Sequence, residues 1–340
     1  MKIINNDLLH EELLKRQPLL KFDEERDFDE WKASVKEKFI ELLRLDESAE
    51  NACEIKIDIE EEIKMDGYTR YRYTFESERG CVAPCYLLIP DTGKEKYPIM
   101  VCVQGHSAGF HISIGKHIYD GDERALESST FALDAVKNGY AALCIEQRGL
   151  GERRPISKER GRVDGEGCPC QHTAMGALLA GRTLLGERVW DISRAIDSLK
   201  FFDSLDLSDI TCIGHSGGGT ATYYASCYDQ RIKLAVPSCA VCTYRHSIGD
   251  MWHCTCNYVP QMAKFFDMGE LAVLIAPRKL VLVNGKVDPI FPIEGTREVY
   301  STIEKIYEKA GARDNCKLIE TPREHYFCKD IIFGKVTKRD

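Results

Sequence analysis

The chain contains no uncharged apolar run that approaches the roughly 18 residues needed to cross a bilayer. Its N-terminal segment, MKIINNDLLHEELLKRQPLL, also lacks the basic start, apolar core and small-residue cleavage site of a secretory signal. These absences argue against an integral membrane protein and against a secreted one. We therefore expect a soluble, cytoplasmic protein.

Basic residues are fewer than acidic ones. Lys and Arg number 46 against 54 Asp and Glu, which gives a formal net charge of −8 at pH 7. This balance argues against nucleic acid or an anionic membrane as the main partner. A small uncharged molecule remains compatible with it, so we expect a small-molecule substrate, no nucleic acid and no membrane.

No internal repeat and no linker rich in Pro, Gly and Ser interrupts the 340 residues. One large domain is therefore favoured over two. We expect a helical N-terminal extension over residues 1–50, a candidate subunit contact in a homo-oligomer, and a single α/β domain over 51–340. The irregular stretch 239–268, rich in Tyr, His, Trp and Cys, predicts a lid-like insertion.

Cysteine, by contrast, is abundant, with 15 residues. Several cysteines lie in apolar segments, such as Cys102 in IMVCVQG and Cys144 in YAALCIE, where thiols act as small buried apolar groups. A chain of this size does not need disulfides to stabilise its core, so reduced thiols in a cytosolic protein are the simpler interpretation.

Two Cys-rich segments, CPCQH and HCTCNY, raise the question of a metal site. Their candidate ligands are Cys168, Cys170 and His172 in the first and His253, Cys254 and Cys256 in the second. The C-x-C spacing is not the C-x-x-C of a typical zinc knuckle. CAVC has that spacing at Cys239 and Cys242, but it follows a predicted core strand. We therefore expect pocket-lining or buried thiols, no metal and no cofactor.

The hydrophobic pattern changes along the chain. Apolar residues at helical spacing in 28–42 predict an amphipathic helix, and strand-like alternation over 53–90 predicts an antiparallel edge. After residue 97, apolar strands alternate with helices. The strands are IMVCVQG, AALCIEQ, ITCIGHS, KLAVPSC, KLVLVNG and CKLIET, and the helices are ALESSTFALDAVKNG, LLGERVWDISRAIDSLKFF and IEGTREVYSTIEKIYEKAG. This alternation predicts an α/β fold with a mostly parallel central sheet and helices on both faces.

The strand DITCIG leads into Gly214-His215-Ser216-Gly217-Gly218 and then into a small-residue stretch that can form a helix. A serine in G-x-S-x-G between a strand and a helix is typical of a nucleophile elbow. The flanking glycines allow the unusual backbone angles of a sharp turn. We predict Ser216 as a nucleophile and the N–H of Gly217 as an oxyanion donor. A passive serine in a glycine-rich connector is the alternative.

A serine nucleophile needs a histidine base and an orienting carboxylate, which follow it in the order carboxylate, then histidine. Asp288 lies just past the strand KLVLVNG, and Glu294, which opens the next helix, is a weaker rival. Of the three histidines after Ser216, only His325 also follows Asp288. We predict the set Ser216, Asp288 and His325. Asp288 as a turn former before Pro289 and His325 as a surface residue are the alternatives.

A second oxyanion donor normally comes from the loop after an earlier strand. IMVCVQGHSAGF fits this role because Gly105 ends a strand and an open polar turn follows. The backbone N–H of His106 is the predicted donor, with Ser107 as the near alternative. The side chain of His106 is expected to be structural or to line the pocket.

Other residues have less specific roles. The arginines of RGLGERR are expected to brace a loop through ion pairs, with binding of an acidic sugar or phosphate as the alternative. They are Arg148, Arg153 and Arg154. Trp252, Tyr258 and Phe110 could stack on a sugar ring, although single aromatic residues more often pack in the core.

With its serine, aspartate and histidine in this order, the sequence resembles the α/β-hydrolase superfamily. More narrowly, it is similar to the acetyl xylan esterase-like branch, related to dienelactone hydrolases and cephalosporin C deacetylases. The similarity covers residues from about 80 to 330. It is carried by EQRGLGERRP, LLGERVWDISRAIDSL, IGHSGGGT, CTYRHSI, NYVPQM, LIAPRKLVLVNGKVDPIFP and the His325 loop. Two features depart from the pattern: Gln104-Gly105 replaces the usual His-Gly pair, and the elbow carries serine where dienelactone hydrolases use cysteine.

The resemblance implies a serine carboxylesterase that hydrolyses short-chain esters, most simply acetyl esters of carbohydrates or oligosaccharides, through an acyl-enzyme. An acyltransferase or peptidase on the same scaffold is the alternative, because a fold does not determine a reaction. A catalytically dead binding protein is the least favoured interpretation.

Overall fold

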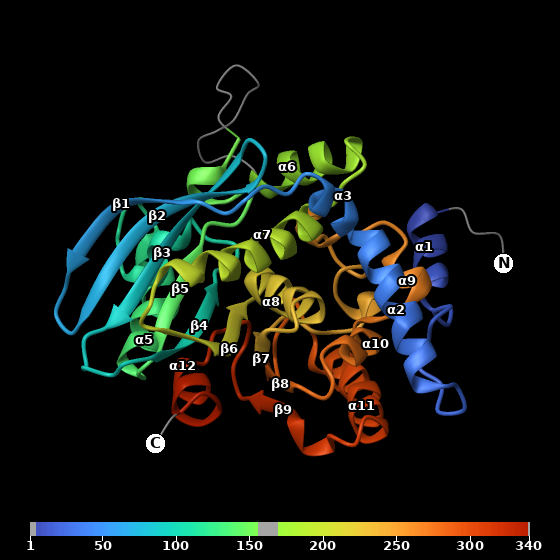
Figure 1. Ribbon diagram of the computed structural model, residues 1–340. Coiled ribbons are helices and arrows are strands. Elements are labelled where there is room, and N and C mark those ends of the chain that lie inside the picture. The colour runs from blue at the N-terminus through green and yellow to red at the C-terminus, as the bar shows by residue number, and fades with distance from the viewer. Residues whose placement is uncertain (1–4, 156–168, 339–340) are drawn as a thin grey trace.

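The structure is a computed structural model that describes residues 5–155 and 169–338. Within these residues the chain forms a sheet of nine strands with helices on both faces (Figure 1). The strands are β1 (Ile57–Lys64), β2 (Tyr68–Glu78), β3 (Cys81–Pro90), β4 (Tyr97–Val103), β5 (Ala141–Ile145), β6 (Leu205–His215), β7 (Ile232–Ser238), β8 (Lys279–Gly285) and β9 (Cys316–Thr321). The α-helices are α1 (Asn6–Leu14), α2 (Phe28–Leu43), α3 (Leu45–Glu50), α4 (Asp122–Leu126), α5 (Phe131–Lys137), α6 (Pro169–Leu179), α7 (Leu184–Ser198), α8 (Gly217–Tyr228), α9 (Met262–Phe265), α10 (Met268–Leu271), α11 (Ile293–Lys309) and α12 (Lys329–Ile331).

The strands follow the order β1-β2-β3-β5-β4-β6-β7-β8-β9. The first three pair antiparallel, as do β3 and β5, whereas every pair from β5 to β9 is parallel. The parallel strands are nearly continuous apolar runs because both of their faces are covered. The predicted α/β fold, with its antiparallel N-terminal edge, is confirmed.

Side chains that alternate along each strand divide the interior into two layers. On β4, Ile99, Val101 and Val103 join the core beneath α2, α7, α8 and α11, whereas Met100 and Cys102 join the core beneath α5 and the C-terminal turns. Helices α7 and α8 cross in front of the sheet in Figure 1. The carboxyl ends of the parallel strands are therefore held rigidly from both sides, which suits them to present loop residues.

The N-terminal helices pack on this core. Trp31, Val35 and Phe39 form the buried face of α2, as its apolar spacing predicts, and they belong to the main core cluster. The N–H groups of Leu19 and Leu20 donate to carbonyl oxygens of α9, so the N-terminal segment lies beside the late part of the chain (Figure 1). The boundary at residue 50, between a helical extension and the α/β domain, stays a prediction.

One predicted helix is interrupted. The stretch 125–139 forms the end of α4 and then α5, which begins only at Phe131. Between them lie Ser128, Ser129 and Thr130, whose side chains bond to each other and to Asp134. Short hydroxyl side chains compete with helical hydrogen bonding, and this local chemistry overrides the apolar periodicity.

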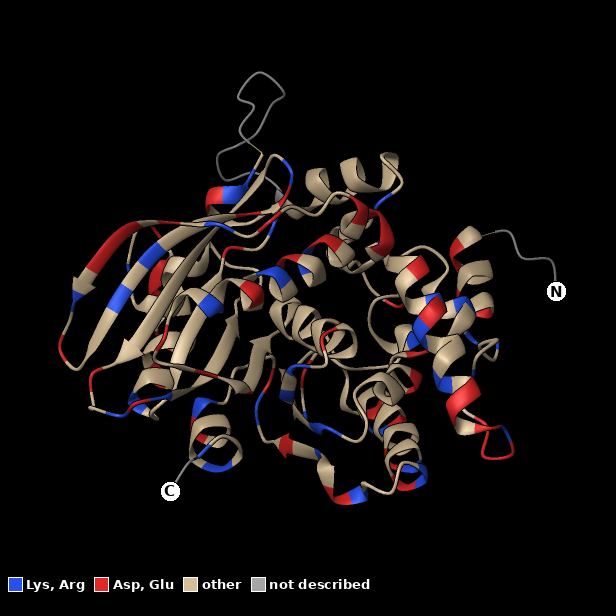
Figure 2. Ribbon diagram, viewed as in Figure 1, with Lys and Arg blue, Asp and Glu red and all other residues tan. Residues whose placement is uncertain are grey.

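The exposed edge strand β1 carries acidic side chains along its length (Figure 2). Charge on an open edge discourages pairing with another chain. Among the described residues, no helix is long and apolar enough to cross a membrane. Within the same residues, no disulfide joins two cysteines.

Candidate functional site

Ser216 occupies the sharp turn between β6 and α8. Its φ and ψ of 55° and −126° are strained for a residue with a side chain, and α8 begins at the next residue. The N–H of Ser216 donates to the carbonyl of Ser238 at the end of β7, 2.9 Å away. The turn therefore has the strand–turn–helix geometry that G-x-S-x-G predicts.

The glycines around this turn are required by close backbone contacts. A Cβ on Gly214 would lie 2.3 Å from the carbonyl oxygen of Gly218, and one on Gly218 would lie 2.3 Å from that of Gln104. A Cβ on Gly105 would come within 2.8 Å of the carbonyl oxygen of His215. The loop after β4 is thus pressed against the elbow, and a side chain at these positions would separate the two segments.

Asp288 and His325 lie in the loops after β8 and β9. Nδ1 of His325 donates to Oδ2 of Asp288 at 2.9 Å, while Oδ1 accepts from the N–H groups of Ile290 and Phe291 at 2.8 and 3.0 Å. Burial alone would raise the pKa of Asp288. The hydrogen bond and charge of His325, together with the two N–H groups, outweigh burial and lower that pKa below its usual range. Glu294 is instead exposed in the first turn of α11.

Ser216 and His325 line one pocket of about 390 Å³. His106 and Ser107, from the loop after β4, form part of the same wall. The 239–268 stretch contributes Met251, Trp252, His253 and Cys254, and Trp252 is 84% exposed. The structure therefore brings the predicted serine, histidine and oxyanion loop to one pocket, and the irregular insertion covers part of it.

The side chain of His106 packs on the elbow. A Cβ added to Gly217 would lie 2.5 Å from Cε1 of His106, so the imidazole rests against the residue that follows Ser216. The Nε2 atom of His106 lies 3.1 Å from Sγ of Cys256. The two predicted N–H donors, on His106 and Gly217, thus come from segments in direct contact.

His215 and His253 also line the pocket, where His253 was considered from the sequence only as a candidate metal ligand. The ring of His215 lies 4.7 Å from that of His325, and burial followed by the charge of His325 lowers the pKa of His215 to about 3. Burial, followed by the charge of His106, lowers the pKa of His253 to about 4. Neither histidine therefore adds positive charge beside His325 at neutral pH.

The arginines after β5 form a buried ion-pair network, as expected of a braced loop. Arg148 donates to both oxygens of Asp191 at 2.8 Å and pairs with Glu78 at 2.6 Å, and Arg153 pairs with Asp191 at 2.6 Å. Burial would raise the pKa of Asp191, but Arg153 and Arg148 lower it well below its usual range. Arg154 in turn donates to the carbonyl oxygen of Ala108 at 3.2 Å, so all three arginines are engaged within the protein.

Of the three aromatic residues considered for stacking, Trp252 lines the pocket and is 84% exposed, and Tyr258 is 40% exposed. Phe110 is 1% exposed and packs on Tyr86, with ring centroids 4.7 Å apart, so stacking on a sugar is wrong for Phe110. The hydroxyl of Tyr258 donates to the carbonyl of Ile248.

The cysteine-rich segments meet in an arrangement that their spacing did not reveal. Cys170, Cys254 and Cys256 lie with His106 so that all four ligand atoms are within 4.8 Å of one another. Cys168 lies outside the described residues. Cys239 and Cys242 point to different neighbours: Cys239 lies beside Asp288 and His325, and Sγ of Cys242 contacts the carbonyl of Pro292.

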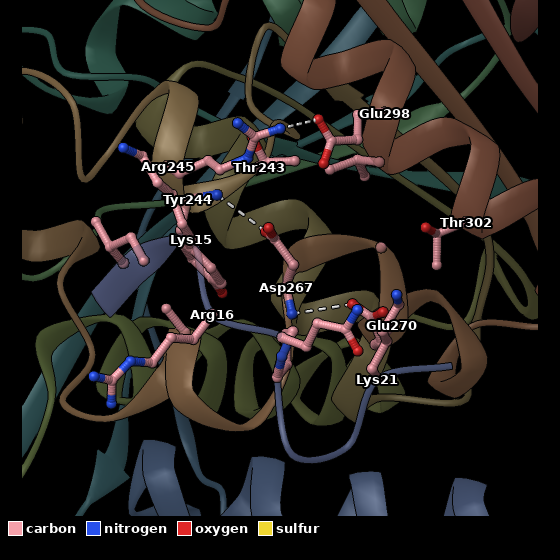
Figure 3. A pocket seen from close by; sticks show the side chains of 16 residues that line it. Lys15, Arg16, Lys21, Thr243, Tyr244, Arg245, Asp267, Glu270, Glu298 and Thr302 are labelled. Atoms are coloured by element: carbon pink, nitrogen blue, oxygen red, sulfur yellow. Dashed lines mark hydrogen bonds and ion pairs between the residues drawn. The ribbon is translucent and has the colours of Figure 1, made fainter. Parts of the chain in front are cut away.

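A second pocket of about 180 Å³ lies under the N-terminal segment (Figure 3). Arg245 pairs with Glu298 at 2.5 Å, and the carboxylates of Glu270 and Asp267 accept the backbone N–H groups of Asp267 and Tyr244. Burial raises the pKa of Asp267 to about 7. Among its described lining residues there is no Ser, Cys or His. Among the described residues, this pocket therefore lacks the serine and histidine that line the first one.

Two protein-family models match this chain. Residues 2–164 match a model described as Abhydrolase family, and residues 98–268 match one described as alpha/beta hydrolase fold. The chain is 26% identical over 290 residues to "Putative hydrolase YtaP" of Bacillus subtilis (strain 168), covering 84% of this chain and 87% of that protein.

Two solved structures share the fold at low identity. A "putative acetyl xylan esterase" from Bacteroides fragilis is 17% identical with a TM-score of 0.77, covering 94% of this chain and 83% of that one. The methylesterase BT1017 is 19% identical with a TM-score of 0.70, covering 98% of this chain and 70% of that one. At these identities the likeness establishes the fold.

Proposed function

The chain belongs to the α/β-hydrolase fold family, and from that premise we propose that it is a serine esterase with Ser216 as nucleophile, His325 as base and Asp288 as the orienting carboxylate. One observation carries the proposal. The hydrogen-bonded pair of His325 and Asp288 shares a pocket with Ser216, which occupies a strained turn at the start of α8. A nucleophile, a base and its orienter are what acyl transfer through serine requires.

The reaction proceeds in two steps. Oγ of Ser216 attacks the ester carbonyl carbon while Nε2 of His325 takes the hydroxyl proton, and the N–H groups of Gly217 and His106 stabilise the oxyanion. The tetrahedral intermediate collapses, His325 returns the proton to the leaving alcohol, and the acyl group stays on Ser216. Water then attacks the acyl-enzyme, with His325 again taking the proton, and the free acid leaves.

The substrate we propose is a short-chain, acetyl-type ester of a carbohydrate. The pocket volume of about 390 Å³ suits a small acyl group. The exposed Trp252 offers an apolar face to a sugar ring at the rim.

Hydrolysis of p-nitrophenyl acetate by the full chain tests this function. We expect turnover by the wild type and a loss of about 10⁵-fold or more in kcat for Ser216→Ala. The control is Ser34→Ala, which changes an exposed serine of α2 and should retain full activity. A wild type without turnover on acetyl to butyryl esters, or a Ser216→Ala variant that keeps a tenth of the activity, would overturn the proposal.

A further inference from the structure

Three cysteines and a histidine converge from three separate parts of the chain beside the pocket. His106 comes from the loop after β4, Cys170 from α6, and Cys254 and Cys256 from the insertion. Their ligand atoms all lie within 4.8 Å of one another. Sγ of Cys256 lies 3.1 Å from Nε2 of His106 and 3.2 Å from Sγ of Cys254.

These separations suit four ligands around one ion. With Zn–S near 2.3 Å and Zn–N near 2.0–2.1 Å, a tetrahedral site separates its ligand atoms by about 3.6–3.8 Å. To reach this geometry, the separations of 3.1 and 3.2 Å must widen by about half an ångström, and the widest, at most 4.8 Å, must close by up to about 1 Å through side-chain rotation. The two sulfurs of Cys254 and Cys256 are too far apart for a disulfide, whose S–S bond is about 2.05 Å.

Among the described residues, the buried surroundings of the cluster are largely apolar, with Arg188 as a charged neighbour. Cys170 and Cys256 share a buried cluster with Leu150, Ala174 and Leu184. Arg188 is the charged neighbour and is 2% exposed; its Nη2 lies 3.1 Å from Sγ of Cys170.

Among the described residues, Arg188 has no carboxylate partner to balance its buried charge. Its other hydrogen bonds go to the carbonyl oxygen of Arg148, at 2.7 and 3.1 Å. Within residues 5–155 and 169–338 no carboxylate forms an ion pair with Arg188. A buried guanidinium without a compensating charge is costly. Three thiolates and one divalent cation carry a net charge of −1, which balances this arginine.

We propose that His106, Cys170, Cys254 and Cys256 bind a structural zinc ion. Soft thiolate ligands with one imidazole select zinc over magnesium, calcium or manganese. Four protein ligands close the coordination sphere, so the ion serves structure rather than chemistry. Binding releases the three thiol protons to solvent.

The ion would tie the insertion and α6 to the loop that bears the predicted oxyanion donor. His106 contributes its imidazole to the metal and its backbone N–H to the pocket, so the metal positions that loop against Gly217. The C-x-C spacing gave no sign of such a site because the four ligands come from three distant segments. The proposal goes beyond the esterase function and does not depend on it.

Metal content tests the proposal. The full-length protein, expressed with zinc and freed of any affinity tag, is desalted and measured by elemental mass spectrometry. We expect about one zinc per chain in the wild type, in Ser216→Ala and in the control Cys53→Ser. The double variant Cys254→Ser/Cys256→Ser should bind zinc at least about tenfold more weakly.

A second measurement keeps the proposal testable if that variant does not fold. X-ray absorption at the zinc edge of the wild type should give three sulfurs near 2.3 Å and one nitrogen near 2.0–2.1 Å. Wild-type protein that holds less than about a tenth of an equivalent of zinc after such preparation would overturn the proposal. So would iron in place of zinc, or a zinc-free chain that is lighter by two hydrogens through a Cys254–Cys256 disulfide.

Discussion

The imidazole of His106 lies directly against Gly217, where an added Cβ would come within 2.5 Å of Cε1. Gly217→Ala should therefore displace the loop that carries the N–H of His106. The loss of one oxyanion donor reduces kcat by about 10²–10³-fold, with a smaller effect on KM. Steady-state kinetics on p-nitrophenyl acetate measure this change.

The control for that variant is Gly176→Ala, another glycine within a helix, around which a Cβ would meet no atom within 4 Å. It should retain wild-type kcat. A Gly217→Ala enzyme with wild-type kcat would show that the contact between these two segments does not matter for turnover.

Asp288→Asn keeps the size of the side chain but removes its charge. The amide can donate a hydrogen bond to Nδ1 of His325, which favours the tautomer that cannot accept a proton at Nε2. It also carries no charge to stabilise the imidazolium. We expect kcat to fall by about 10³–10⁴-fold. Glu294→Gln, at the exposed start of α11, should leave kcat unchanged. If the two variants exchanged these outcomes, the carboxylate would be Glu294.

His215 should make the folded protein less stable in acid. Its pKa is about 3 in the fold and about 6.5 in an unfolded chain, so between these pH values the unfolded state binds the additional proton. The free energy of unfolding therefore decreases as the pH falls below about 6.5, by up to about 1.4 kcal/mol per pH unit. Urea unfolding at several pH values measures this slope.

His215→Gln should make that dependence shallower, whereas His10→Gln, at an exposed position on α1, should leave it unchanged. Identical slopes for the wild type and His215→Gln would mean that His215 does not lose its proton on folding.

Trp252 tests the sugar part of the proposed substrate. Trp252→Ala should raise KM for acetylated oligosaccharides by about five- to tenfold, since one aromatic contact contributes about 1 kcal/mol. Turnover of p-nitrophenyl acetate, which has no sugar ring, should stay within about twofold of wild type. A loss of equal size on both esters would assign Trp252 a structural role.

Much of the fold follows from local patterns. The apolar strands after residue 97 coincide with β4 to β9 because a parallel sheet covered on both faces requires continuous apolar runs. The sharp turn at Ser216 follows from the glycines around it, since Gly214 and Gly218 meet backbone atoms closely and Gly217 meets the ring of His106. The break between α4 and α5 did not follow from periodicity, because the Ser-Ser-Thr stretch forms its own hydrogen bonds.

What the sequence could not show is convergence in space. Cys170 lies far along the chain from His106, and only the packing of α6 and the insertion brings them together. The neutral state of His215 likewise depends on burial, which no residue pattern encodes. The contact between Asp288 and His325 was predictable because chain order and the shared sheet edge constrain both residues.

The most direct test of the proposed mechanism is to map a covalent adduct. A fluorophosphonate reacts with an activated serine, so the intact wild-type chain should gain one phosphonyl group, located by peptide sequencing on Ser216 within CIGHSGGGTATYY. His325→Ala should label far more slowly, and Ser216→Ala should not label at all. An adduct on another residue, or an esterase that stays active and unlabelled, would contradict the assignment of Ser216 as the nucleophile.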